Sequence, residues 1–427
     1  MLRLLIENTL DREEKIMAEW IECKISDIGT VVGGATPSTK KAENYEDGNI
    51  AWITPKDLST FSGRYIKRGE RNITEIGLKS CSTQLLPKNT VLFSSRAPIG
   101  YVAIAANEVC TNQGFKSVVP NENTDPLFLF YLLKYNKDKI EGMGSGTTFK
   151  EVSGNTMKNI IVNVPADKGV QEKIATILGS IDDKIEENEQ INNNLEQQAQ
   201  AIFKEWFIDN PENENWSNGT FSELIQSTLS GDWGKEAPTG NNTEKVYCVR
   251  GADIPEVRAG NIGKMPTRYI LPKNYASKKL TAGDIVVEIS GGSPTQSTGR
   301  CTAISESLLN RYDSGMVCTN FCRAIKPLSG YSMFIYYYWQ YLYDKGVFFS
   351  YENGTTGIKN LDISGFLGTE PIIIPPKEKV LALDDYCQTV FDRIFANGKE
   401  SEQLSKLRDT LLPKLMSGEL DVSDIDL

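Results

Sequence analysis

Histidine is absent from the 427-residue chain. Its absence excludes Ser-His-Asp and Cys-His nucleophilic catalysis, the HExxH zinc site and an imidazole general base. The chain also lacks the GxxxxGK[ST] loop of nucleotide-hydrolysing enzymes and the [DNS]PP[FYW] tetrapeptide of adenine methyltransferases, because "IPPKEK" and "NPENEN" do not match it. These absences favour recognition over catalysis, and a modification enzyme with degenerate motifs is the less favoured alternative.

Long apolar runs and cysteine pairs are missing as well. The run "MFIYYYWQYLY" is shorter than the roughly 20 residues of a membrane-spanning helix and indicates a buried helix. The eight cysteines include no CxxC, which favours reduced, partly buried thiols and a cytoplasmic location. Acidic residues interrupt the apolar start, residues 1–16, so we expect an amphipathic extension instead of a signal peptide, with Met17 as an alternative start.

The sequence contains an internal repeat. The strings "VCTNQGF" and "VCTNFC" place Cys110 and Cys318 at the same point of a shared Cys-Thr-Asn block, 208 positions apart (318 − 110). The strings "WIECKISDIG" and "WSNGTFSELI" correspond at an offset of 196, which also places Asp57 over Asp253 (253 − 57). The strings "GSGTTFKEVS" and "ENGTTGIKNLDIS" correspond further along. The chain is therefore two divergent copies of one unit of roughly 200 residues.

Each copy ends in a long helical stretch. Short β-rich runs separated by Gly, Pro and Asn turns come first, and residues 170–207 and the segment after Pro376 then show apolar residues every three or four positions. Such spacing is typical of a coiled-coil stripe, and about 38 helical residues at about 1.5 Å each would make a spacer of about 57 Å. The residues that we expect to pack between the two helices are Ile181, Ile185, Asn188, Leu195, Ile202, Val390, Ile394, Asn397, Leu404 and Leu411.

Asn188 and Asn397 occupy the same place in the two stripes, 209 positions apart (397 − 188). A polar residue at a core position is one way to set helix register and partner. The alternative is that both asparagines lie on a solvated helix face, beside the apolar contact between the two helices. Both interpretations are open at this point.

Charge is distributed unevenly along the chain. Residues 167–214 carry twelve acids and four bases, a net charge of −8 out of the chain's −10. Residues 245–279 carry eight bases against two acids, and residues 56–79 carry six against three. Basic stretches interleaved with tyrosines suit contact with phosphates and base edges, and a solvated surface is the alternative.

Two variable globular units, each followed by a long helix in matching register, resemble the DNA specificity subunit of type I restriction-modification enzymes. The resemblance covers residues 17–420 and also rests on "SSRAPIG", "IVNVP" and "LPKLMSGEL". It implies an α+β protein with an internal pseudo-two-fold repeat. Two mixed α/β target recognition domains, residues 17–166 and 209–376, would be joined by two antiparallel coiled-coil helices, residues 167–208 and 377–420.

The resemblance also implies a function. Each recognition domain would read one half of a split, asymmetric double-stranded DNA sequence, and the helices would set the spacer. The partners would be two methyltransferase subunits and restriction/translocase subunits, without a membrane. S-adenosylmethionine, ATP and Mg would belong to those partners, so the chain would bind no cofactor. An orphan or exchangeable DNA-binding module without methyltransferase partners is the alternative.

We expect no catalytic or metal-binding residue and a set of individual DNA contacts. Arg and Lys bind phosphates or guanine, and Asn and Gln pair with adenine. The expected contacts are Lys56, Arg64, Arg68, Arg71, Arg96, Asn112 and Gln113 in the first copy and Arg250, Arg258, Arg268, Gln296, Arg300 and Asn320 in the second. The second copy lacks "SSRAPIG", so Arg96 has no counterpart. Asn112 and Asn320 have an alternative role in a shared scaffold turn, since residues that read different half-sites should differ.

Overall fold

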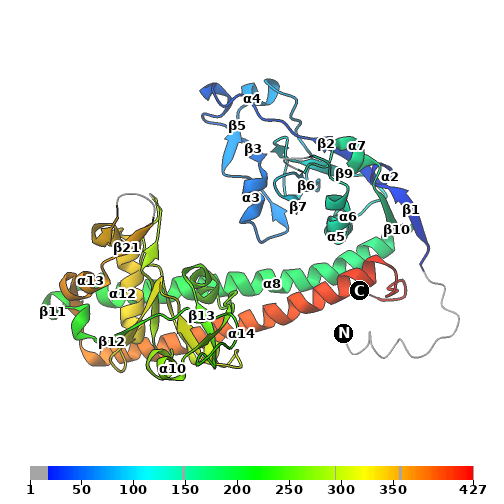
Figure 1. Cartoon of the computed structure of the whole chain (residues 1–427). Helices are drawn as coiled ribbons and strands as arrows, with labels where there is room; N and C mark the ends of the chain where they lie inside the picture. Colours follow the sequence, from blue (N-terminus) through cyan, green and yellow to red (C-terminus); the bar gives the residue numbers. More distant parts are fainter. Residues whose placement is uncertain (1–17, 147–149, 294, 355–357, 427) are drawn as a thin grey trace. The chain divides into compact units, whose positions relative to one another are not determined.

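The computed structural model describes residues 18–146, 150–293, 295–354 and 358–426. The predicted extension at residues 1–16 and part of both Gly-Thr-Thr segments lie outside these ranges. The chain forms two compact units (Figure 1): the first unit is Met1–Lys184 with Leu404–Leu427, and the second unit is Ile185–Gln403. Each unit therefore includes part of both long helices, whereas the sequence assigned those helices to separate spacer segments.

Among the residues that the structure describes, three sheets belong to the first unit. The largest has the order β2-β9-β6-β7-β4, with the strands Gly29–Gly33, Lys116–Pro120, Val91–Ser95, Ile99–Ala105 and Tyr65–Ile66. A second has the order β5-β3-β8, with the strands Arg71–Ile73, Ile50–Ile53 and Cys110–Thr111. The third pairs β1 (Trp20–Lys24) with β10 (Ile161–Pro165). The β-rich runs of the first copy are thus confirmed as strands.

A helical segment of the first unit packs on β6 and β7 of the largest sheet. The expected helix after residue 125 is present as α5 (Pro126–Tyr135) and α6 (Lys137–Gly142), and Asp125 caps α5 by accepting a hydrogen bond from the backbone amide of Phe128 (2.7 Å). Six successive residues of α5 are buried in the core of this unit. The others are α2 (Ile25–Ile28), α3 (Pro55–Ser59), α4 (Glu75–Lys79) and α7 (Gly154–Lys158).

The described part of the second unit contains four sheets. The first has the order β12-β19-β15-β17, with the strands Ile225–Ser230, Cys322–Pro327, Ile285–Glu288 and Cys301–Ala303. The second, β14-β13-β18, contains Thr267–Ile270, Glu244–Val249 and Met316–Cys318. The others are the pair β11 (Ser217–Thr220) with β22 (Pro371–Ile374) and the sheet β16-β21-β20 of Ser290–Gly291, Lys359–Leu361 and Glu352–Asn353.

The expected buried helix of the second unit is α12 (Ser332–Asp344). Its Tyr336, Tyr337 and Trp339 are at most 1% exposed, so the aromatic run forms core and is not a surface or membrane feature. Four shorter helices are α9 (Ile254–Arg258), α10 (Pro272–Lys278), α11 (Glu306–Leu309) and α13 (Ile363–Thr369). Among the residues that the structure describes, no helix combines the length and apolar character needed to cross a membrane.

The strand pairings of the two units confirm the internal repeat. Strand β3 pairs antiparallel with β5 and parallel with β8, and β13 pairs in the same way with β14 and β18. The Asp57 carboxylate accepts hydrogen bonds from the backbone amides of Thr54 and Glu70, both at 2.7 Å. Asp253 accepts bonds from the amides of Arg250, 196 positions after Thr54 (250 − 54), and of Lys264, 194 positions after Glu70 (264 − 70). The offset of 196 therefore aligns residues with the same structural role.

The two long helices begin close to where the sequence places them. Helix α8 covers Lys168–Phe203 and continues into a π-helical turn, Lys204–Ile208, while α14 covers Lys377–Met416. Of the residues expected to pack between them, Ile181, Asn188, Val390, Ile394 and Asn397 are buried, and Ile185, Leu195, Ile202, Leu404 and Leu411 are partly buried.

Buried asparagines link α8 to α14 inside the second unit. The Asn192 amide donates to the carbonyl oxygens of Ile394 (3.0 Å) and Ala259 (3.1 Å), and its own oxygen accepts a bond from the Asn397 amide (2.9 Å). The Asn188 amide donates to Glu400 (2.8 Å). As residue numbers rise along α8 their partners' numbers fall along α14, so the helices run antiparallel in this unit. Asn188 and Asn397 are 1% and 3% exposed, which contradicts a solvated face.

Asn192 is the first of three consecutive asparagines, and the other two provide a control for a substitution at Asn192. Asn193 and Asn194 are exposed, whereas Asn192 is 5% exposed. We expect Asn192→Leu to cost about 2 kcal/mol, because it leaves the buried Asn397 amide without its acceptor. Hydrogen exchange of amides in the second-unit part of α14 should accelerate about 30-fold, and Asn194→Leu should leave it unchanged. Equal effects of the two variants would contradict a specific role of the buried amide.

All eight cysteines are free, and six of them are buried. Burial raises the pKa of the Cys110 thiol to about 11 and that of the Cys301 thiol to about 12. Because the thiolate is the reactive form, these side chains behave as small apolar core groups. The described residues also contain no cluster of three or more acidic or cysteine side chains that could hold a metal ion.

Candidate nucleic-acid interface

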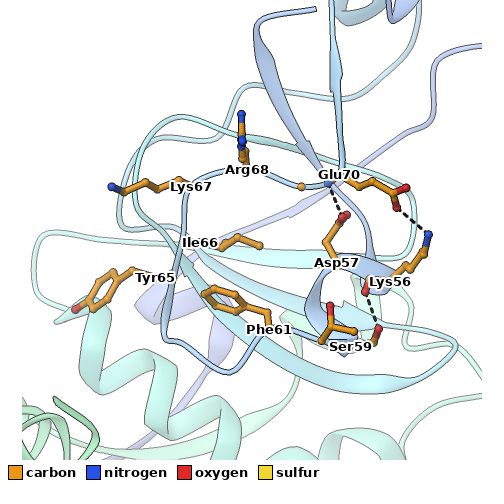
Figure 2. Close-up of a pocket in the computed structure, with 11 residues that line it drawn as sticks. Lys56, Asp57, Ser59, Phe61, Tyr65, Ile66, Lys67, Arg68 and Glu70 are labelled. Carbon is orange, nitrogen blue, oxygen red and sulfur yellow. Dashed lines mark hydrogen bonds and ion pairs between the residues drawn. The ribbon is translucent and has the colours of Figure 1, made fainter. Parts of the chain in front are cut away.

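A hollow of about 650 Å³ opens on the first unit beside α3 (Figure 2). Lys67 and Arg68 follow each other along its wall, and Figure 2 shows their side chains pointing in different directions, away from the buried Ile66. The same two residues line a second hollow of about 500 Å³. Both are exposed, and within the described ranges neither side chain has a hydrogen-bond or ion-pair partner. The rim between the hollows therefore presents two adjacent positive charges.

Local contacts hold this rim in place. Asp57, which takes part in the N-terminal cap of α3, accepts a hydrogen bond from the backbone amide of Glu70. This bond holds the end of the exposed segment 67–70 against the start of α3. Gly69 permits the approach, because a Cβ at this position would lie 2.7 Å from the Asp57 Oδ2 atom. At the other end, β4 pairs with β7 through Ile66, which is 4% exposed. The exposed bases therefore stand on a segment that is anchored on both sides.

The other expected contacts of the first copy differ in exposure. Lys56 pairs with Glu70 at 2.7 Å on the surface, an ion pair of little energetic weight. Arg71 stacks on the Tyr45 ring at 4.2 Å, and Arg96 lies 3.8 Å from Glu151. DNA contact stays a prediction for Lys56, Arg71 and Arg96. Asn112 is partly buried in its turn, and Gln113 is exposed beside Thr36.

Arg64 requires a correction. Its residue is only 5% exposed, and its guanidinium donates to the Gly179 carbonyl (3.2 Å) and the Asp183 carboxylate on α8. A buried guanidinium whose donors are used by its own chain does not reach DNA. Arg64 therefore fastens the recognition part of the first unit to its helix, and we no longer assign it to DNA.

The expected arginines of the second copy also bind acids of their own unit. Arg250 binds Asp253, and Arg300 forms two bonds to Glu288 (2.8 and 2.7 Å). These bonds raise the pKa of both guanidinium groups, which remain partly exposed. DNA contact by Arg250 and Arg300 stays a prediction. Gln296 is exposed, as is Asn320.

Arg258 and Arg268 depart further from the expectation. Arg258 donates to Gln340 on α12 and lies 3.6 Å from Glu196 on α8, so it joins the core elements of the second unit. Arg268 is 8% exposed and stacks on the Trp233 ring at 3.8 Å. Arg268 is buried, so the prediction of DNA contact is withdrawn for it. Arg258 is partly exposed, and its contact with DNA stays a prediction.

Sequence reasoning missed the exposed residues that the structure leaves available. Lys67 lies beside Arg68 but was passed over, and in the second unit Lys264, Lys273 and Lys279 are exposed with no side-chain partner among the residues described. The basic stretches did contain all four. The sequence does not show which basic side chains form ion pairs with acidic residues in the folded chain.

The fold defines a class of protein: a repeated protein of two mixed α/β units, each of which contains part of the same two long helices. Residues 17–197 match the family described as type I restriction modification DNA specificity domain. The chain is 35% identical to the type I restriction enzyme MjaIX specificity subunit of Methanocaldococcus jannaschii, with 96% of each chain covered. The chain therefore belongs to the type I restriction enzyme specificity subunits, which confirms the resemblance found in the sequence.

Two further similarities cover almost the whole chain. The HindI specificity subunit of Haemophilus influenzae is 24% identical, covering 95% of this chain and 100% of the relative. A crystal structure of the type I restriction-modification S subunit from M. genitalium superposes with a TM-score of 0.56 at 16% identity, covering 95% of this chain and 98% of that one. The second comparison supports the fold: two mixed α/β domains joined by long helices.

Proposed function

We propose that this chain reads a split, asymmetric double-stranded DNA target, one half-site per unit, and has no catalytic centre. The observation that carries the proposal is the pairing of a shared scaffold with different surfaces. Both units have the β3-type and β13-type strand pairings, yet their exposed residues differ. Two copies of one scaffold with different surfaces suit two different half-sites.

The partners in this proposal are methyltransferase and restriction/translocase subunits. A repeated chain offers equivalent docking surfaces twice, which suits two methyltransferase subunits. S-adenosylmethionine, ATP and Mg would be bound by those partners, and the assembled complex would act in the cytoplasm. The net charge of −8 over residues 167–214 disfavours contact between α8 and DNA phosphates, so DNA binding is assigned to the sheet-containing parts.

Methylome sequencing tests this function. Cells expressing the chain with its cognate methyltransferase subunit should gain adenine methylation at one split motif, and the motif should disappear when this chain is deleted. A stable complex that adds no methylation would contradict the proposal and favour the orphan module. Radiolabel transfer from S-adenosylmethionine by the purified chain alone would contradict a non-catalytic role.

The exposed rim of the first unit supplies a prediction. The Lys67→Ala/Arg68→Ala variant should bind the methylated-motif oligonucleotide about tenfold more weakly and lower the slope of log affinity against log salt by about 2. Fluorescence anisotropy over a range of salt concentrations measures both quantities. The control, Lys88→Ala/Lys158→Ala, removes the same charge from exposed positions of the same unit outside both hollows. An equal loss in the two variants would indicate general attraction and not local contact.

A further inference from the structure

A buried arginine joins the sheet-containing part of the first unit to the long helix α8. Arg64 comes directly before β4, and its guanidinium donates one hydrogen bond to the Gly179 carbonyl (3.2 Å) and another to the Asp183 carboxylate. The two acceptors are four positions apart on α8 (183 − 179), so they lie one turn apart on the same face of the helix. The planar guanidinium of arginine, with its five donors, suits two acceptors placed in this way. Arg64 therefore attaches β4 to one face of α8.

Helix α8 accommodates this arginine with a glycine. Gly179 lies in the interior of α8, where glycine is disfavoured because of its conformational freedom. A Cβ at this position would lie 3.3 Å from the Arg64 Nη1 atom and 3.0 Å from the Leu127 Cδ2 atom. A larger side chain would displace the guanidinium from the helix. The close approach of Arg64 and Leu127 therefore explains a residue that weakens the helix itself.

Arg64 also lies next to the exposed rim that Lys67 and Arg68 form. These two bases directly follow β4, three and four positions after Arg64. The apolar cluster that contains Ile66, the neighbour of Lys67, includes no residue of α8 within the described ranges. Packing in this cluster therefore does not attach the rim to the helix. The hydrogen bonds of Arg64 do so, at a point close to the rim in the chain.

The second unit is attached to α8 by similar chemistry. The Tyr337 hydroxyl donates to Glu196 (3.2 Å), and the Arg258 guanidinium lies 3.6 Å from the same carboxylate. In the first unit, the Tyr131 hydroxyl donates to Asp182 on the same helix (2.6 Å). Acidic residues of α8 therefore bind a tyrosine and an arginine of each unit. Such bonds attach the sheet-containing part of each unit to one continuous helix.

We propose that Arg64 is a positioning residue, which holds the rim at a fixed place along α8 and so fixes the spacing at which the first half-site is read. This inference rests on the proposed function and goes beyond it, because it gives a role in target selection to a side chain that does not reach DNA. A helix of set length defines a spacer only if the surface that reads DNA is held rigidly to it. Loss of the link lets the rim shift, so half-sites at neighbouring spacings are accepted.

Duplexes that carry both half-sites of the methylated motif test this role, with the spacer unchanged, one base pair shorter or one base pair longer. The methylation rate of the complete complex at the original spacer, divided by its rate at either altered spacer, gives a spacer preference. Arg64→Met should lower this preference about tenfold, the scale of losing hydrogen bonds to a charged group. Asp183→Ala changes an exposed side chain, so the unit should fold normally, and the preference should fall about threefold.

Two controls separate positioning from stability. Glu172→Ala removes an exposed carboxylate of the same helix, and Val109→Ala weakens a buried cluster to which α8 contributes no described residue. Both should keep the wild-type preference. An unchanged preference in Arg64→Met and Asp183→Ala would overturn the proposal, whether or not the rate falls, and so would a wild-type complex that accepts the three spacers equally. These outcomes leave the proposed function standing, whereas a wild-type complex that methylates no split motif would remove it.

Discussion

Inserting four residues into both long helices, after Lys184 and after Gln403, is expected to lengthen the spacer of the DNA target by about one to two base pairs and to leave both half-sites unchanged. Four helical residues add about 6 Å, and one base pair spans about 3.4 Å. The insertion points lie where α8 and α14 pass from one compact unit to the other. Each unit would therefore keep its own helix contacts.

The position of the insertion matters because of the buried asparagines. An insertion into α8 alone near Asn192 would move it away from Ile394 and Ala259, its partners in the same unit. Methylome sequencing of cells expressing the double-insertion variant with the methyltransferase subunit gives the new motif directly. A control with four exposed residues of each helix replaced by alanine should keep the original spacer. An unchanged spacer in the insertion variant would show that the helices do not set it.

Arg408→Met is expected to destabilise the first unit by about 3 kcal/mol. The Asp182 side chain is buried and accepts hydrogen bonds from the Arg408 guanidinium (2.7 Å) and the Tyr131 hydroxyl (2.6 Å). Burial raises the pKa of Tyr131 far above its usual value, so the hydroxyl remains a donor at every working pH. Methionine keeps the aliphatic volume of the arginine but removes the guanidinium that binds the Asp182 carboxylate. Removing one partner of a buried ion pair is strongly destabilising, because the other charge stays buried without compensation.

Hydrogen exchange shows which unit loses stability in Arg408→Met. Protection of α5 amides should fall about 100-fold, while α12 in the second unit should be unchanged. Asp409→Ala removes an exposed acid that also binds Arg408, and it should cost no more than about 0.5 kcal/mol. The double variant Asp182→Leu/Arg408→Met should recover most of the stability, because neither charge is then left alone. Unaltered α5 exchange in Arg408→Met would contradict this account.

The repeat, the strands and the long helices could be predicted because their signals are local or periodic. The apolar spacing after residue 165 predicted a helix from residue 170, and α8 begins at Lys168. The individual DNA contacts could not be predicted as well. Arg64 belongs to a basic stretch of the sequence, but folding buries it and brings Asp183 to it from a position far away in the chain.

Sequence alone shows a duplicated chain that lacks histidine, a GxxxxGK[ST] loop and a [DNS]PP[FYW] tetrapeptide. It also indicates where both long helices lie and which of their residues face inward, because helical periodicity can be read from the spacing of apolar residues along the chain. Which asparagine of the Asn192 run is buried, and which bases remain exposed, depends on the folded structure. Burial and hydrogen-bond partners depend on segments that folding brings together. These segments are far apart in the sequence, so neighbouring residues in the chain do not reveal the partners.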